Sequence, residues 1–218
     1  MKIAILGGTG SIGEGFALRW ASKHDIVVCS RDVDKAIKAA DDYSNLLLSK
    51  GTLCCGITGC TNETAIQDVD VVVLSVPYKG MVPLLEKLKP FFKDQIVISM
   101  VVPMAKNDKF EYTPPEQGSA ALEIKSVLPE TVKVISAYHN ISAKKLADLE
   151  STLDYDVVIC GDDEDAKKTV MELTHEINNL RPLDGGGLES SYMIESLTPF
   201  LINLAIKNGL RDLGVKFL

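Results

Sequence analysis

A glycine-rich turn between two apolar segments constrains the fold of this chain more than any other feature. Ile3–Leu6 and Ile26–Cys29 are short apolar runs typical of buried strands. The residues between them form an amphipathic helical pattern of about three turns. A strand, a helix and a second strand in this close succession predict a βαβ unit with two parallel strands.

Gly8, Gly10 and Gly13 give the turn the spacing G-x-G-x-x-G, directly after the first strand and at the start of the helix. The first glycine allows a tight turn, the second lets the backbone approach a pyrophosphate, and the third lets the helix and the strand pack closely. The N-terminus of the helix then presents unpaired N–H groups to the phosphates. The turn therefore predicts a dinucleotide-binding site.

The end of the second strand indicates which dinucleotide binds. NAD sites usually carry Asp or Glu at this position, whereas this chain has Ser30 and Arg31. A guanidinium pairs with a phosphate and a hydroxyl donates to one, while a carboxylate would repel it. Lys35, one helical turn further on, adds a second positive charge. We predict NADP(H) as the cofactor; a solvated surface turn formed by Arg31 and Asp32 is the alternative.

The composition of the 218 residues is that of a globular protein, with 46% hydrophobic and 24% charged residues. A net charge of −7 without a basic stripe argues against a nucleic-acid partner. The apolar segments are too short for a membrane span, and the chain starts directly with a predicted strand, so we expect no signal peptide. Five cysteines without a C-x-x-C pair and three separated histidines predict reduced thiols, no metal site and a cytoplasmic location.

Strand and helix patterns alternate along the chain, which predicts an α/β fold with a Rossmann-type doubly wound parallel sheet. The pattern changes near residue 140, so we expect an NADP-binding domain at 1–140 and a smaller C-terminal α/β domain at 141–218. The third strand is expected at Leu53–Ile57. The polar, proline-containing residues 104–118 are expected to form a surface loop.

The last long segment, about residues 188–209, is helical and apolar around much of its circumference. Pro199 would start or kink a helix there. Because a helix of this kind needs burial on several sides, we expect it to form a subunit interface, most simply in a homodimer.

Several predicted strands end in residues suited to a ligand site, since ligands of doubly wound sheets bind outside the carboxyl ends of the strands. The strand that starts at Val69 ends in a serine, a valine and a proline, and the strand Val132–Ala137 precedes a histidine and an asparagine. A plain proline turn and a structural histidine are the alternatives. At the site we expect the following strand-end residues: Ser75, Val76, Pro77, Val102, His139 and Asn140.

The chain lacks the acid–base groups with which related dehydrogenases oxidise alcohols. No tyrosine has a lysine four residues later, as short-chain dehydrogenases require, and no lysine has the asparagine that β-hydroxyacid dehydrogenases carry at that spacing. Hydride exchange between two cofactors needs little acid–base help, because both redox centres bring their own electronics and the protein supplies proximity and orientation.

Six segments identify a protein family more specifically than the glycine spacing does. They are GGTGSIGEG at 7–15, SR at 30–31, SAYHNISA at 136–143, VICGDDEDAKK at 158–168, LRPLDGG at 180–186 and ESLTPFLINL at 195–204. In these segments the chain resembles the archaeal F420-dependent NADP reductase family over nearly its whole length. The resemblance implies hydride exchange between NADP and reduced coenzyme F420, an 8-hydroxy-5-deazaflavin. Both would bind as small-molecule partners in a cleft closed by the smaller C-terminal domain.

The resemblance also implies roles for individual residues, which fall into groups for the pyrophosphate, the 2′-phosphate, the two rings and the deazaflavin side. The groups are, in that order, Thr9 with the loop glycines; Ser30, Arg31 and Lys35; Val76, Pro77, Ala137 and His139; and Ser196 and Thr198. Ser11 and Ile12 are also expected to bind the cofactor. His139 would orient the rings or stabilise charge on the deazaflavin. The family commonly has Trp where Tyr78 stands and Thr where Asn140 stands.

Two other functions fit the same cofactor site. One is an NADPH-dependent reductase of flavins or ferric chelates, an activity of related folds. The other is a non-catalytic NADP(H) sensor that reports the redox ratio to a partner protein.

Overall fold

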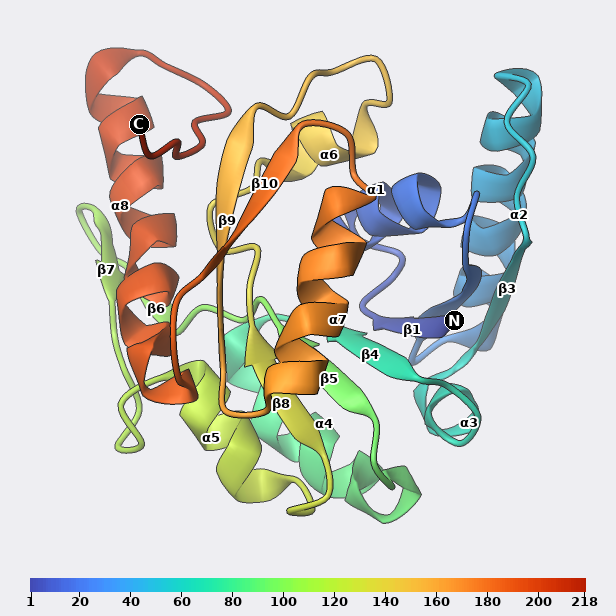
Figure 1. The fold of residues 1–218 in the computed structure, drawn as a ribbon, viewed down its shortest axis with the longest axis horizontal. Helices are drawn as coiled ribbons and strands as arrows, with labels where there is room; N and C mark the ends of the chain where they lie inside the picture. The colour runs from blue at the N-terminus through green and yellow to red at the C-terminus, as the bar shows by residue number, and fades with distance from the viewer.

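A computed structural model describes residues 1–218, and eight of its strands form one sheet with helices on both faces (Figure 1). The sheet strands are β1 (Lys2–Leu6), β2 (Asp25–Ser30), β3 (Gly56–Thr61), β4 (Val71–Leu74), β5 (Ile96–Ser99), β8 (Lys133–Ser136), β9 (Tyr155–Gly161) and β10 (Leu180–Asp184). The helices are α1 (Ser11–Trp20), α2 (Val33–Ser49), α3 (Asn62–Ile66), α4 (Met81–Leu88), α5 (Ala120–Val127), α6 (Ala143–Ala147), α7 (Glu164–His175) and α8 (Ser191–Asn208).

The strand order is β10-β9-β8-β5-β4-β1-β2-β3, and every neighbouring pair is parallel except β8 with β9. The run from β3 to β8 has the order of a doubly wound dinucleotide-binding sheet, in which the direction of winding reverses between β1 and β4. The predicted Rossmann-type fold is therefore confirmed. Because β9 pairs with β8, the single sheet continues across the domain boundary that we expected at residue 140.

The two faces of the sheet carry separate hydrophobic cores, because the inner strands are buried on both sides. One core joins the sheet to α1, α2, α6 and α7, and the other joins it to α3, α4 and α5. Alternate residues of β1 divide between them: Ile3 and Ile5 lie in the first core and Ala4 and Leu6 in the second. None of the helices combines the length and the apolar character that crossing a lipid bilayer requires.

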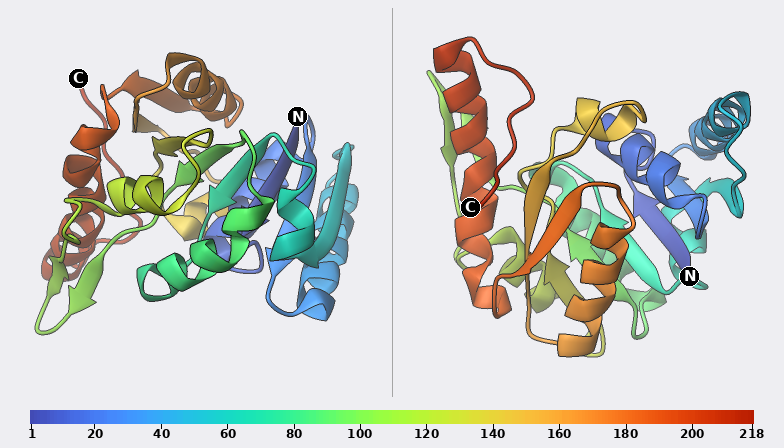
Figure 2. Two further views of the ribbon diagram at one scale, coloured as in Figure 1. Left: turned by 90° about the horizontal axis from the view of Figure 1, so that it is seen from below. Right: turned by 45° about the horizontal axis from the view of Figure 1, so that its top comes forward.

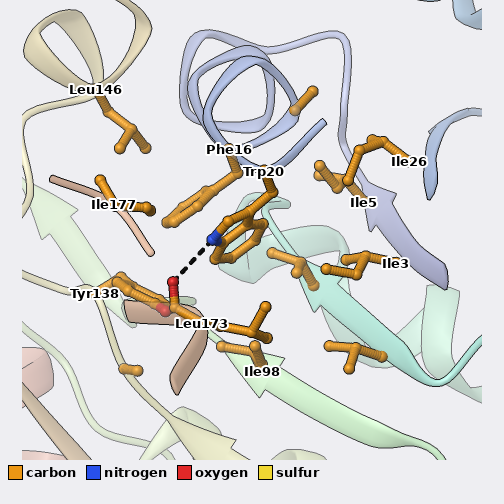
Figure 3. Packing of buried hydrophobic residues seen from close by; sticks show 14 of the residues in the cluster. Ile3, Ile5, Phe16, Trp20, Ile26, Ile98, Tyr138, Leu146, Leu173 and Ile177 are labelled. Carbon is orange, nitrogen blue, oxygen red and sulfur yellow. Dashed lines mark hydrogen bonds between the residues drawn. The ribbon is translucent and has the colours of Figure 1, made fainter. Parts of the chain in front are cut away.

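An aromatic cluster anchors the end of β8 in the first core (Figure 3). The Tyr138 ring packs edge-on against Phe16 at a centroid distance of 4.8 Å, and its hydroxyl lies 2.7 Å from the Thr174 hydroxyl. Trp20 stacks on Phe16 at 4.5 Å and donates from Nε1 to the Leu173 carbonyl at 2.9 Å. These contacts hold Tyr138 in the left-handed conformation (φ 68°), which non-glycine residues rarely adopt. The chain turns here, immediately before His139.

Two expectations about local structure were wrong. The third strand is β3 at Gly56–Thr61, and residues 53–55 precede it. Part of 104–118 is not loop but an antiparallel hairpin, β6 (Met104–Lys106) with β7 (Phe110–Tyr112).

The hairpin stands beside α8, at the opposite end of the molecule from α2 and β3 (Figures 1 and 2). The Asn203 side chain joins them, because it accepts from the Phe110 N–H at 2.9 Å and donates to the Phe110 carbonyl at 2.6 Å. Pro199 lies inside α8, so it does not start the helix.

Candidate functional site

The glycine turn lies where the winding of the sheet reverses, next to the carboxyl end of β4. Gly7 has a φ of +81°, and a Cβ atom there would lie 2.1 Å from the Ser75 carbonyl oxygen. We expected Gly8 to supply the turn conformation; the left-handed residue is Gly7, one position earlier. Only glycine fits at Gly7, because both the backbone conformation and the space exclude a side chain.

The third glycine of the motif has the predicted packing role. A Cβ atom on Gly13 would lie 2.6 Å from the Gly8 Cα, so α1 starts in direct contact with the turn. The first hydrogen bond of the helix runs from the Glu14 N–H to the Gly10 carbonyl at 2.8 Å. The N–H groups of Ser11, Ile12 and Gly13 therefore have no acceptor within the helix and are available to an anion.

A cleft of about 440 Å³ opens in front of this turn, and we call it the glycine-loop cleft. It contains two cationic side chains and no carboxylate, although the whole chain carries a net charge of −7. The local charge of this cleft therefore favours an anion. The lining residues are Gly7, Thr9, Cys29, Ser30, Arg31, Asn62, Ser75, Val76, Pro77, Lys79, Gly80 and Leu84.

Two of the three residues expected at a 2′-phosphate lie in the glycine-loop cleft. Arg31 is exposed and has no hydrogen-bond or ion-pair partner within the chain, and the Ser30 hydroxyl accepts from the Asp32 N–H at 3.2 Å. Lys35 does not line the cleft, and its ammonium lies 3.7 Å from the Asp32 carboxylate. Arg31 is thus the free cation at the end of β2.

A second hollow of about 290 Å³, the middle pocket, continues from the glycine-loop cleft. The two share Ser75, Val76 and Pro77, so the loop after β4 forms a wall of both. The middle pocket is mostly apolar, which suits flat ring systems. Its lining residues are Ile12, Ser75, Val76, Pro77, Met100, Val102, Tyr138, His139, Ile141 and Thr198.

His139 is a nearly buried side chain of the middle pocket, with 6% of its surface exposed. Neither ring nitrogen has a hydrogen-bond partner in the chain. Burial lowers the pKa of His139 to about 3, so the imidazole is neutral near pH 7. A neutral imidazole presents one N–H donor and one acceptor, and a polar ligand in the pocket would satisfy them.

The low pKa predicts that acid destabilises the protein through His139. The unfolded chain binds a proton there below its ordinary pKa of 6.5, whereas the folded chain does so only near a pKa of about 3. The free energy of unfolding therefore falls as the pH drops through this window, with a His139 contribution of about 2 kcal/mol between about pH 7 and about pH 5. Urea unfolding of the protein and of His139→Asn at both pH values measures this contribution. An identical pH dependence in both proteins would contradict the burial argument.

A third hollow of about 270 Å³, the α8 pocket, adjoins the middle pocket and shares His139, Ile141 and Thr198 with it. The Thr198 hydroxyl donates to the His139 carbonyl at 2.5 Å, which ties α8 to the loop after β8. Neighbouring hollows thus share lining residues, and the three lie next to one another between the glycine turn and α8. The α8 pocket is lined by His139, Asn140, Ile141, Ser142, Ala143, Thr198, Leu201, Ile202, Ala205, Asp212 and Leu213.

Some residues expected at the site lie at its margin. Asn140 lines the α8 pocket, and its amide donates to the Asp156 carbonyl at 2.8 Å. Ser196 lines none of the three hollows and donates to the Met193 carbonyl at 2.7 Å. Ala137 is fully buried behind them. The roles expected for these residues stay predictions.

Asn62 and Lys79 line the glycine-loop cleft, but neither was predicted from the sequence. Lys79 follows the Pro77 turn by only two residues, so the rule that ligands bind at strand ends could have found it. Asn62 directly follows β3. Because the third strand was expected several residues too early, its carboxyl end, and with it Asn62, was misplaced.

Glu195 is a further residue that sequence reasoning missed. Its fully buried carboxylate accepts from the Tyr112 hydroxyl at 2.8 Å and from the N–H groups of Ala120 and Ala121 at 2.9 and 3.0 Å. Burial raises the pKa of Glu195 above its ordinary value. These bonds join α8 to α5 and the hairpin, and so fix the helix that carries Thr198.

Known proteins resemble this chain along almost its entire length. A family model described as NADP oxidoreductase, coenzyme F420-dependent, matches residues 2–103. The F420-dependent NADP reductase of Methanocaldococcus jannaschii is 41% identical over 219 residues, which cover 99% of this chain and 97% of that protein. The F420-dependent NADP reductase of Methanothermobacter thermautotrophicus is 36% identical, over 99% of this chain and 94% of that protein.

A solved structure from Arthrobacter sp. has the same fold, with a TM-score of 0.82 at 21% sequence identity over 100% of this chain and 99% of that one. The fold, the glycine turn and the full-length similarity agree, and the resemblance seen in the sequence motifs is confirmed. This chain belongs to the F420-dependent NADP reductase family.

Proposed function

We propose that this chain catalyses reversible hydride transfer between C5 of reduced coenzyme F420 and C4 of the nicotinamide of NADP. The observation that carries the proposal is the row of neighbouring hollows between the glycine turn and α8, in a chain whose relatives are named F420-dependent NADP reductase. Neighbouring hollows that share walls give two substrates room to meet. Proximity of this kind removes much of the entropic cost of a two-substrate reaction.

The glycine-loop cleft supports NADP as one substrate. The unpaired N–H groups at the start of α1, directly after the cleft residue Thr9, suit a pyrophosphate, and Arg31 within the cleft suits the additional 2′-phosphate. A carboxylate that would favour the NAD ribose is missing from the lining of the cleft. Thr9 lines the same cleft, which supports the role in pyrophosphate binding that we propose for it.

The middle pocket supports a meeting of two flat rings. When bound, the nicotinamide and the deazaflavin supply the redox chemistry themselves. Val76, Pro77 and Val102 provide apolar walls that exclude water, and His139 offers a neutral donor and acceptor to orient polar ring substituents. Thr198 holds the His139 backbone in place.

The deazaflavin absorbance of F420 tests the proposal most simply. Purified protein mixed anaerobically with F420 and NADPH is expected to bleach this absorbance, and F420H2 with NADP is expected to restore it. Bleaching of FMN or reduction of a ferric chelate in place of F420 would support the alternative reductase. NADPH binding without transfer to any of these acceptors would support the NADP(H) sensor.

His139→Ala is expected to lower kcat or raise the KM for F420 by about 10-fold, because the pocket loses its polar orienting group. Steady-state kinetics with F420 varied at saturating NADPH measures the change. Replacing the exposed His175, which lies in α7 and lines none of the three hollows, is the control. An unchanged enzyme would make His139 a structural residue.

We further propose that the segments before and after residue 140 bind different substrates. The glycine-loop cleft is built only from residues before this point, while most residues of the α8 pocket come after it. Residues 1–140 would hold NADP, and residues 141–218 would complete the deazaflavin side.

We also propose a cytoplasmic homodimer, consistent with five free cysteines and an uncovered apolar face of α8. Tyr192, Met193, Phe200 and Ile206 are each about half exposed or more on this helix. Light scattering of the protein and of Phe200→Glu tests the dimer.

A further inference from the structure

Asn62 lies beside the residues expected at the 2′-phosphate. Ser30 and Thr61 are register partners in the parallel pair β2–β3, so Arg31 and Asn62 are the next residues along the two neighbouring strand ends. Both side chains line the glycine-loop cleft. The register therefore places Asn62 and Arg31 directly after neighbouring strand ends, and both residues line this cleft.

The Asn62 side chain is buried, with 5% of its surface exposed, and makes no hydrogen bond within the chain. Its Oδ1 atom is buried without a partner, and the residue lines the glycine-loop cleft. A phosphate bound in the cleft would supply the acceptor that the amide N–H groups of Asn62 lack within the chain. The carboxylate of the following residue, Glu63, forms an ion pair with the Lys87 ammonium at 2.5 Å.

We propose that Asn62 is a specificity-determining residue that donates from its amide to the 2′-phosphate of NADP(H), beside Ser30 and Arg31. The inference rests on the proposed function, since it assigns a further contact to the same substrate. No carboxylate competes for this amide, because the lining of the glycine-loop cleft contains none.

The chemistry of the three side chains favours a phosphate over a free hydroxyl. A phosphate offers three acceptor oxygens, and an amide, a guanidinium and a hydroxyl all donate. The ribose 2′-hydroxyl of NAD is recognised best by a carboxylate, and the lining of the cleft contains none. The arrangement therefore discriminates in favour of the phosphorylated nucleotide.

Calorimetric binding of adenosine 2′,5′-bisphosphate and of 5′-AMP isolates the contribution of the 2′-phosphate. Asn62→Asp replaces the donor with a carboxylate of the same shape, so the preference for the bisphosphate is expected to fall by about 100-fold. Asn62→Ala removes the donor alone and is expected to reduce the preference by about 10-fold. Asn178→Asp, an exposed residue between α7 and β10, is the control with the same charge change and is expected to retain the preference.

A structural role would weaken both nucleotides equally and leave their ratio unchanged, which would overturn the inference. Thermal unfolding identifies a variant that does not fold, and Asn62→Ala then decides the question alone. The binding assay uses no F420, so it is independent of hydride transfer. Wild-type protein that prefers the bisphosphate but transfers no hydride would refute the proposed function and leave the role of Asn62 intact.

Discussion

Arg31→Ala is expected to raise the KM for NADP(H) by about 100-fold while changing the KM for NAD(H) by no more than about threefold. Arg31 is the cation of the glycine-loop cleft nearest the end of β2, and it has no partner within the chain. Its charge is therefore free to pair with the 2′-phosphate, which NAD lacks. Initial rates of F420H2 oxidation with each nucleotide measure the effect.

Lys35→Ala is the matched control for the loss of one positive charge. The Lys35 ammonium lies outside the cleft and near the Asp32 carboxylate, so a smaller increase in the KM for NADP(H) is expected. If Arg31→Ala weakened NADP and NAD equally, the assignment of the 2′-phosphate to Arg31 would be wrong.

Alanine substitutions at Gly13 and Gly10 are expected to separate folding from cofactor binding. At Gly13 a Cβ atom would lie 2.6 Å from the Gly8 Cα, so Gly13→Ala must push α1 away from the turn. The expected loss is about 1–3 kcal/mol of unfolding free energy. At Gly10 the nearest atom would be 3.4 Å away, so Gly10→Ala is expected to keep its stability within about 1 kcal/mol.

The same two variants should both bind NADPH at least about 10-fold more weakly, but for different reasons. Gly13→Ala displaces the N–H groups at the start of α1, whereas Gly10→Ala places a methyl group where the pyrophosphate approaches. Urea unfolding and NADPH fluorescence measure the two quantities. Normal NADPH affinity in Gly10→Ala would contradict the placement of the pyrophosphate at this turn.

Local patterns in the sequence were sufficient for the first part of the fold. The glycine spacing and the flanking apolar runs predicted β1, α1 and β2, because each of these elements is specified by neighbouring residues. The apolar core strands β4 and β5 were predictable for the same reason, since strands buried on both faces read as continuous apolar segments.

The elements that were missed depend on contacts between distant residues. β3 lies at the edge of the sheet, and its sequence GITGCT is only half buried, so no apolar run marks it. The hairpin β6–β7 is stabilised against α8 by Asn203, nearly a hundred residues away. The sequence around the hairpin, rich in charged residues and prolines, gives no sign of this partner.

The site was predicted in its parts but not in its assembly. Val76, Pro77 and His139 were expected near the rings and Thr198 on the deazaflavin side, and all four line the middle pocket. His139 is buried and its ring nitrogens have no hydrogen-bond partner. The register of β2 with β3 brings Asn62 and Arg31 to neighbouring strand ends. Both are properties of the folded sheet, which residue spacing alone does not contain.

Transfer of an isotopic label tests the central claim most directly, namely that the two rings meet in the middle pocket and exchange hydride without an intermediate carrier. NADPH with deuterium at both C4 positions is incubated anaerobically with F420 and the protein in ordinary water, and the reduced F420 is analysed by mass spectrometry. Direct transfer predicts one deuterium at C5 of the deazaflavin. Reduced F420 that carries only hydrogen from water would contradict the account.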